Sequence, residues 1–116
     1  MIRNGRKLMG LAVVAGLLLG AGQALGQTQF RSLSGTVVDQ HREPLKGAVV
    51  EVENLGDMQV QSFLTDAAGH YSFKRLDGGA DYSYWAQYRG HKSRSRTLSK
   101  FSAKMAPVVT LVIKLE

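Results

Sequence analysis

Three histidines, His41, His70 and His91, are the residues of this chain best suited to bind a metal ion. Imidazole is a good zinc ligand, but the three lie far apart in sequence and match no spacing typical of a zinc site. If successive strands alternate in direction, the loops that carry them gather at one end of the fold, together with Arg42 and Arg89. A metal or anion site at this end is one hypothesis, and we favour the other, solvent-exposed loop histidines.

The segment Lys92–Ser99 offers a second kind of chemistry, the binding of anions. Lys92, Arg94 and Arg96 alternate with small hydroxyl residues, so in a strand they would share one face, and three unpaired cations must face water. Trp85, predicted to point outward on the preceding strand, could add an aromatic platform for an anionic glycan, a lipid headgroup or an acidic protein. The interpretation that we favour is a polar edge strand whose charges prevent aggregation.

The remaining polar residues give no catalytic pattern. Asp57, Asp77 and Asp81 are expected at the end opposite the histidines, but they lack the dense series of acidic ligands that a calcium loop needs. No serine stands in a nucleophile-elbow sequence. We therefore predict no catalytic residue, no cofactor and no metal centre.

Residues 1–26 have the features of a secretory signal peptide. A positively charged start precedes an uncharged apolar run, residues 8–21, and residues 24–26 give the small-x-small pattern of a cleavage site before Gln27. The apolar run is short for a membrane anchor of about 20 residues, which is the alternative. Because the chain has no cysteine, it is not expected to be a lipoprotein. We predict a secreted or periplasmic protein with no membrane span after cleavage.

The charge that remains on residues 27–116 is modest but unevenly distributed. Without the three cations of the signal peptide, 12 of the 15 basic residues remain against nine acids, so the net charge falls from +6 to +3. This weakens the case for a nucleic-acid partner, and none is predicted. Between Asp81 and Glu116 there are seven basic residues and no acid.

Short alternating segments separated by turn residues run through residues 27–116, which we take as one domain. The seven predicted strands are residues 32–39, 48–54, 59–65, 70–76, 81–88, 92–99 and 108–115. This rhythm is typical of an all-β protein, and we predict a seven-stranded antiparallel Greek-key β-sandwich of the immunoglobulin-like kind. In the sixth segment Leu98 would point to the same side as the three cations in a regular strand. Either a bulge must interrupt the strand or the leucine is exposed.

A set of spaced motifs extends over much of this domain. The motifs are Gly35-x-Val37-x-Asp39, Pro44-Leu45-x-Gly47-Ala48-x-Val50-x-Val52, Thr65-Asp66-x-x-Gly69-x-Tyr71-x-Phe73, Leu76 and Tyr82. They resemble the carboxypeptidase regulatory-like domain, and the resemblance covers residues 32–115. It implies a transthyretin-like, prealbumin-type sandwich. The tail from Gly90 to Phe101 resembles small stand-alone secreted bacterial forms. The family usually has glycine at the position of Arg42, so either the loop is rebuilt or Arg42 adopts a left-handed backbone.

The resemblance implies a non-catalytic module. In metallocarboxypeptidases such a domain lies beside the catalytic domain, and here we expect the partner to be a separate protein or an anionic envelope glycan. The alternative is a purely structural or assembly module without a ligand, and the oligomeric state is not predicted. A third reading is a transthyretin-related small hydrolase, whose signature resembles Tyr88-Arg89-Gly90. That signature belongs at the extreme C-terminus, so we regard the match as a coincidence.

Overall fold

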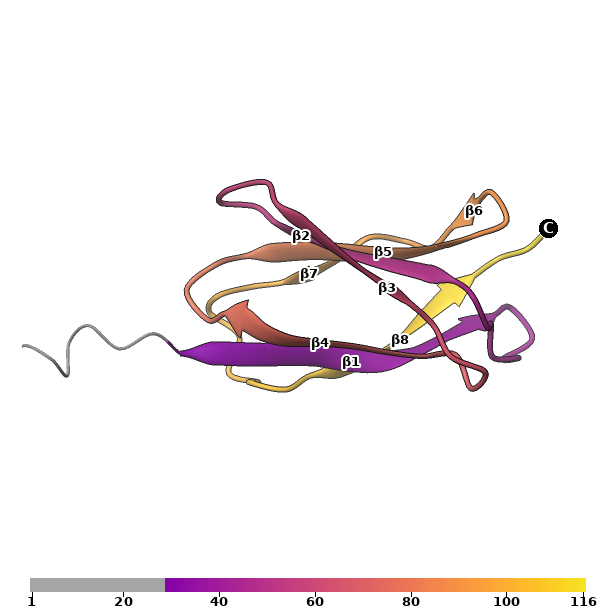
Figure 1. Ribbon diagram of the computed structural model, residues 1–116, viewed down its shortest axis with the longest axis horizontal. Helices are drawn as coiled ribbons and strands as arrows, with labels where there is room; N and C mark the ends of the chain where they lie inside the picture. The colour runs from indigo at the N-terminus through magenta and orange to yellow at the C-terminus, as the bar shows by residue number, and fades with distance from the viewer. Residues whose placement is uncertain (1–28) are drawn as a thin grey trace, which may run out of the picture.

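The computed structural model describes residues 29–116, and every regular element in this part of the chain is a β-strand (Figure 1). The strands are β1 (Phe30–Asp39), β2 (Val49–Asn54), β3 (Val60–Leu64), β4 (His70–Asp77), β5 (Tyr82–Tyr88), β6 (His91–Lys92), β7 (Arg96–Leu98) and β8 (Val108–Ile113). The predicted signal peptide, residues 1–26, lies outside the described residues. Within residues 29–116 there is no helix with the length and apolar character needed to cross a bilayer.

The strands form two layers that face each other (Figure 1). One layer is a three-stranded sheet in the order β4-β1-β8, and the other is a five-stranded sheet in the order β3-β2-β5, with both β6 and β7 paired to β5. The predicted all-β sandwich is therefore confirmed. It differs from the expectation in two details: β1 and β8 run parallel, and the expected sixth strand is divided into β6 and β7.

The core fills the space between the two sheets because the strands alternate as the sequence predicts. In β2, Val50 and Val52 are fully buried, whereas Glu51 and Glu53 face outward and are only partly covered. In β5, Tyr82 and Tyr84 are buried in the same way. The cluster consists of Leu33, Val37, Leu45, Ala48, Val50, Val52, Tyr71, Phe73, Leu76, Tyr82, Tyr84, Ala86, Leu98, Leu111 and Ile113.

The division between β6 and β7 is a bulge, and it turns the Leu98 side chain toward the core. Tyr84 pairs with Arg96 and Gln87 pairs with Lys92, so three residue steps on β5 oppose four steps on the other strand. The extra residue shifts the alternation, and Leu98 becomes 5% exposed, opposite the buried Tyr82. Of the two alternatives predicted from the sequence, the bulge is the correct one.

Gly35 of β1 is required at the position where it lies between its partners on β4 and β8. Its partners are Tyr71 on one side and Val109 on the other. A Cβ added to Gly35 would collide with the carbonyl oxygen of Val109, and the same oxygen accepts a hydrogen bond of 2.8 Å from the Tyr71 hydroxyl. The absent side chain at Gly35 therefore leaves the space in which Tyr71 crosses β1 to reach β8.

Arg31 holds the long connection between β7 and β8 against β1. Its side chain is only 3% exposed. The guanidinium donates to the carbonyl oxygens of Ser99 at 2.8 Å, Ser102 at 3.0 Å and Lys104 at 3.2 Å, and its Nε atom is buried without a partner. Because these contacts join residues far apart in sequence, no local pattern reveals them.

The loop between β1 and β2 keeps its turn despite the absence of the usual glycine. Arg42 has a φ of 68°, so it adopts the left-handed backbone. Asp39 holds the turn, since its carboxylate accepts the backbone N–H groups of His41 at 2.8 Å and Glu43 at 3.0 Å. The loop is therefore not rebuilt, and a residue with a Cβ adopts a conformation that suits glycine.

Candidate functional site

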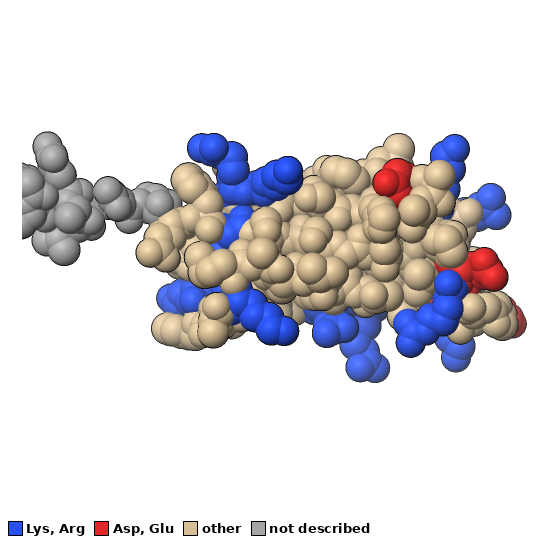
Figure 2. All heavy atoms as spheres, turned by 90° about the horizontal axis from the view of Figure 1, so that it is seen from below, with Lys and Arg blue, Asp and Glu red and all other residues tan. Residues whose placement is uncertain are grey.

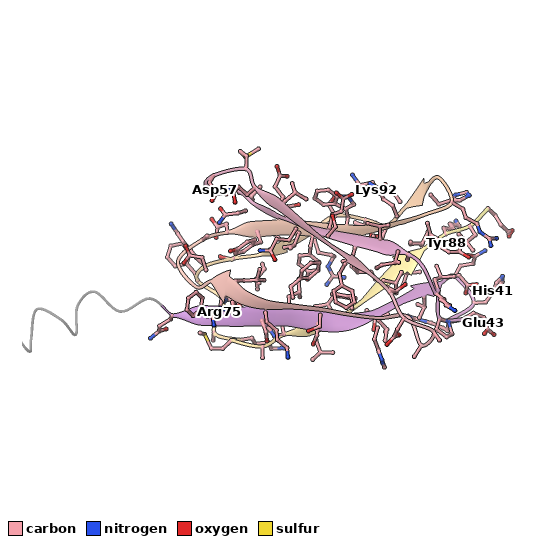
Figure 3. The ribbon with its side chains drawn as sticks, in the orientation of Figure 1. His41, Glu43, Asp57, Arg75, Tyr88 and Lys92 are labelled. Carbon is pink, nitrogen blue, oxygen red and sulfur yellow. The ribbon has the colours of Figure 1, made fainter. Side chains whose placement is uncertain are left out.

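Trp85 and Lys92 lie together on the outer face of the five-stranded sheet. Figure 3 shows Lys92 on the side of this sheet that faces away from the three-stranded sheet. The Lys92 Nζ atom is 4.7 Å from the centre of the Trp85 ring, which is a cation–π geometry. Glu51 is the cross-strand partner of Trp85, and it accepts a hydrogen bond of 3.2 Å from the Gln87 amide. This outer surface thus contains an acid as well as a cation, and its lysine is already engaged by the tryptophan.

Arg96 does not share this face with Lys92. Its cross-strand partner is Tyr84, which points into the core, whereas the partner of Lys92 is the exposed Gln87. Opposed residues of an antiparallel pair point to the same side of a sheet. The three cations predicted to share one face are therefore separated by the bulge, and Arg96 faces the seam between the two sheets.

The seam between β7 and β8 is hollowed and basic. Arg94 and Arg96 line a depression of about 280 Å³ with Ser93, Thr110, Leu111 and Val112. Within residues 29–116 neither arginine has a carboxylate within ion-pair distance, and the one ion pair found there is His70–Asp66 at 3.7 Å. Two exposed guanidinium groups at a sheet edge are thus free to bind an anion.

Arg96 also acts on the tyrosines beneath it. Burial raises the pKa of Tyr71, the nearby Tyr84 raises it further, and the positive charge of Arg96 opposes the increase. Burial likewise raises the pKa of Tyr84, again against the charge of Arg96. Both phenols are therefore neutral at physiological pH and leave the arginine charge uncompensated.

The histidines lie at one end of the sandwich, in or next to three different connections between strands. His41 occupies the β1–β2 loop, His70 begins β4 and His91 begins β6. Figure 3 places His41 at the end opposite Asp57. No group of three His, Cys, Asp or Glu side chains in residues 29–116 is arranged to hold a metal ion. His70 instead pairs with Asp66, whose pKa is lowered by the backbone N–H of His70 and also by that of Ala68.

The three aspartates at the other end line a hollow of about 420 Å³, and their oxygens accept backbone hydrogen bonds. Asp57 accepts the N–H of Gln59 at 3.0 Å, and Asp77 accepts that of Gly79 at 2.8 Å. Asp81 accepts the N–H of Lys100 at 2.6 Å. These bonds give the three carboxylates a structural role in the loops.

Comparison with known proteins identifies the fold and the family. The carboxypeptidase regulatory-like domain family matches residues 32–116. Similar solved structures include 3-chlorocatechol 1,2-dioxygenase from Rhodococcus opacus, with 11% identity, a TM-score of 0.56 and coverage of 76% of this chain and 60% of that one. The major pilin subunit BcpA of Bacillus cereus has 11% identity, a TM-score of 0.58 and coverage of 76% and 31%. These structures share the fold alone.

The chain spans less than two thirds of the length of these solved structures. A sequence comparison with curated proteins gives no match.

Proposed function

Because the chain belongs to the carboxypeptidase regulatory-like domain family, which is non-catalytic, we propose that it is an exported module that binds an acidic partner at the cell envelope. The observation that carries the proposal is the arginine seam, which we define as Arg94, Arg96 and the depression that they share with β8. Both guanidinium groups are exposed and lack a carboxylate partner within the described part of the chain. The partner is an acidic protein or an anionic envelope glycan.

Export rests on the sequence of residues 1–26, with its basic start, apolar run and small residues before Gln27. On this proposal the mature protein is periplasmic or secreted. N-terminal sequencing of the protein recovered outside the cytoplasm should find Gln27 as the first residue. Recovery of the uncleaved chain in the membrane fraction would contradict export as a free domain.

The binding proposal is tested with the mature protein, residues 27–116, on an immobilised anionic glycan such as heparin and on its own envelope extract. The Arg94→Ala/Arg96→Ala variant should elute from heparin at clearly lower salt than the parent, because two phosphate- or sulfate-binding forks are lost. Lys46→Ala/Lys74→Ala is the matched control, since it removes the same charge from exposed positions elsewhere. Equal shifts in both variants would show that only net charge matters and would refute a site at the seam.

A second candidate is an assembly module, and strand β3 favours it. β3 is an edge of the five-stranded sheet, all five of its residues are exposed, and none is charged. Leu64 is 66% exposed and Val60 is 48% exposed, so the edge lacks the charges that normally prevent strand pairing. The fold is shared by a major pilin subunit, so it is compatible with assembly.

Light scattering after size exclusion decides between the two candidates. An assembly module should show dimers or larger species that the Ser62→Lys variant disperses, because a lysine in the middle of an edge strand opposes pairing. Ser62 lies opposite Glu51, so the new lysine has an acidic neighbour and the fold should tolerate it. A monomer at all concentrations would exclude this candidate.

A further inference from the structure

The free edge of β8 is the feature from which a more specific partner can be argued. Within residues 29–116, β8 pairs with β1 alone and ends the three-stranded sheet. In a parallel pair of strands, only every second residue of a strand directs its backbone N–H and C=O groups toward the partner strand. Ser34 of β1 is in register with Val108, but its N–H donates to the carbonyl oxygen of the preceding residue, Pro107. The backbone N–H and C=O groups of Val108, Thr110 and Val112 therefore point away from β1.

This edge has none of the features that usually protect an edge strand. The segment from Val108 to Ile113 contains no charge and no proline, and its ladder with β1 is regular over six residue pairs. Val108 is 77% exposed and Val112 is 41% exposed on the outer face. By contrast, the edge of the other sheet at β6 and β7 is interrupted by the bulge. β8 thus offers both backbone groups and apolar side chains to an incoming strand.

The cations beside this edge determine what kind of strand it can accept. Arg94 and Arg96 lie across the depression from Thr110, Leu111 and Val112. Figure 2 shows the lower face of the molecule, where Lys and Arg surround a broad uncharged centre and the acids occupy one half only. Arginine binds a carboxylate through two parallel hydrogen bonds, so a strand beside β8 would be selected for acidic side chains on the side of the seam.

We propose that the β8 edge binds an extended acidic segment of a partner protein, which adds a strand to the β4-β1-β8 sheet and places its carboxylates on Arg94 and Arg96. The proposal rests on the proposed function, of which it specifies the partner. Successive side chains of the added strand point to opposite faces. Acidic residues on the seam side alternate with apolar residues that contact Val108 and Val112.

A second copy of this chain fits the same edge poorly. The sequence between Asp81 and Glu116 contains no acid, so two copies paired through β8 would bring Arg94 and Arg96 of each close to those of the other. Like charges placed together in this way oppose association. Charge complementarity therefore favours an acidic partner over self-association at this edge.

The experiment measures binding of short peptides to residues 27–116 by fluorescence anisotropy at about 0.15 M salt. The first peptide alternates glutamate and valine over about eight residues, the length of an ordinary strand. The second has the same sequence with alternate backbone amides N-methylated, which keeps its charge but prevents strand pairing. The third replaces glutamate by lysine. We expect the first to bind and the other two to bind at least about tenfold more weakly.

Variants and amide exchange locate the site. The Arg94→Ala/Arg96→Ala variant should bind the first peptide about tenfold or more weakly than the parent does. The affinity of the Lys46→Ala/Lys74→Ala control for this peptide should stay within about twofold of the parent's. Hydrogen exchange of the Val108, Thr110 and Val112 amides should slow when the first peptide binds, because these N–H groups become paired.

Four outcomes overturn the inference, and they differ in what they leave standing. Equal binding of the N-methylated peptide means charge attraction without strand addition and leaves the proposed function intact. Retention on heparin without any peptide binding identifies a glycan as the partner. Protection of the β8 amides that rises with protein concentration and needs no peptide identifies a second copy. Failure of both heparin and peptides to bind overturns the proposed function as well.

Discussion

Replacing Arg42 by glycine should stabilise the domain. Arg42 is exposed and has a φ of 68° in the β1–β2 loop. The left-handed backbone costs about 1–2 kcal/mol for a residue with a Cβ, and glycine avoids this cost. The greater freedom of glycine in the unfolded chain offsets about 0.4–1 kcal/mol of the gain. We expect a net gain of about 0.5–1 kcal/mol, which raises the Tm of a domain of this size by about 2–8 °C.

The hydrogen bonds of the loop should survive the substitution. The Arg42 N–H donates to the carbonyl oxygen of Asp39 at 3.1 Å, and the Asp39 carboxylate accepts backbone N–H groups of His41 and Glu43. Glycine retains every backbone group involved. Arg42→Ala is the matched control, because it removes the same side chain and charge but keeps the Cβ, and it should stay within about 0.5 kcal/mol of the parent.

Thermal and urea unfolding followed by circular dichroism measure both variants. The reasoning predicts that only Arg42→Gly unfolds at higher temperature and higher urea, with an unchanged m-value. If both variants are stabilised equally, the lost side chain is the cause and backbone strain is not. A destabilised Arg42→Gly variant with the parent's m-value would also refute the argument.

Three further perturbations test other parts of the fold. Gly35→Ala should destabilise the domain by about 2 kcal/mol or more, because its Cβ meets the Val109 carbonyl; denaturant unfolding measures this, and a neutral result would contradict it. Arg31→Met should destabilise the domain by about 1–3 kcal/mol and speed hydrogen exchange in the β7–β8 connection, since three carbonyl groups lose their donor; unchanged exchange would argue against that role. Backbone hydrogen bonds lower the pKa of Asp66 in the folded state below the ordinary pKa of an aspartate. The stability that they give is therefore present above that ordinary pKa and lost as the pH falls through the folded pKa. Urea titrations from pH 5 downward should therefore show a weaker pH dependence for Asp66→Asn than for the parent, and identical profiles would reject the assignment.

The alternation of the central strands could be predicted from the sequence because burial on one face leaves a period of two. Val50 and Val52 of β2 and Tyr82 and Tyr84 of β5 face inward as expected, since polar residues such as Glu51 and Ser83 alternate with them. The weak alternation of β3 agrees with its exposed position at the edge of the five-stranded sheet. These features depend on local sequence, and local sequence is sufficient to find them.

Features that join distant segments could not be predicted in this way. The parallel pairing of β8 with β1 follows from the path of the chain and not from the composition of either strand. The contacts of Arg31 with the β7–β8 connection span about seventy positions, and an arginine at the start of a strand gives no sign of burial. The alternation of strand directions predicts that the three histidines lie at one end of the fold. It does not predict how close their side chains are, and within residues 29–116 they form no group that could hold a metal ion.

The arginine seam depends on the same bulge that completes the core. A continuous strand from Lys92 to Leu98 would turn Lys92, Arg94, Arg96 and Leu98 to one face, either exposing the leucine or burying the cations. One extra residue between Lys92 and Arg96 removes this conflict and buries Leu98. Arg96 is two residues before Leu98 and therefore points to the same side of the strand. The shift that buries the leucine thus also turns Arg96 from the outer face to the seam beside β8. The need to bury one leucine is therefore sufficient to separate the cations, and the separation leaves one lysine on Trp85 and two arginines at an unprotected strand edge.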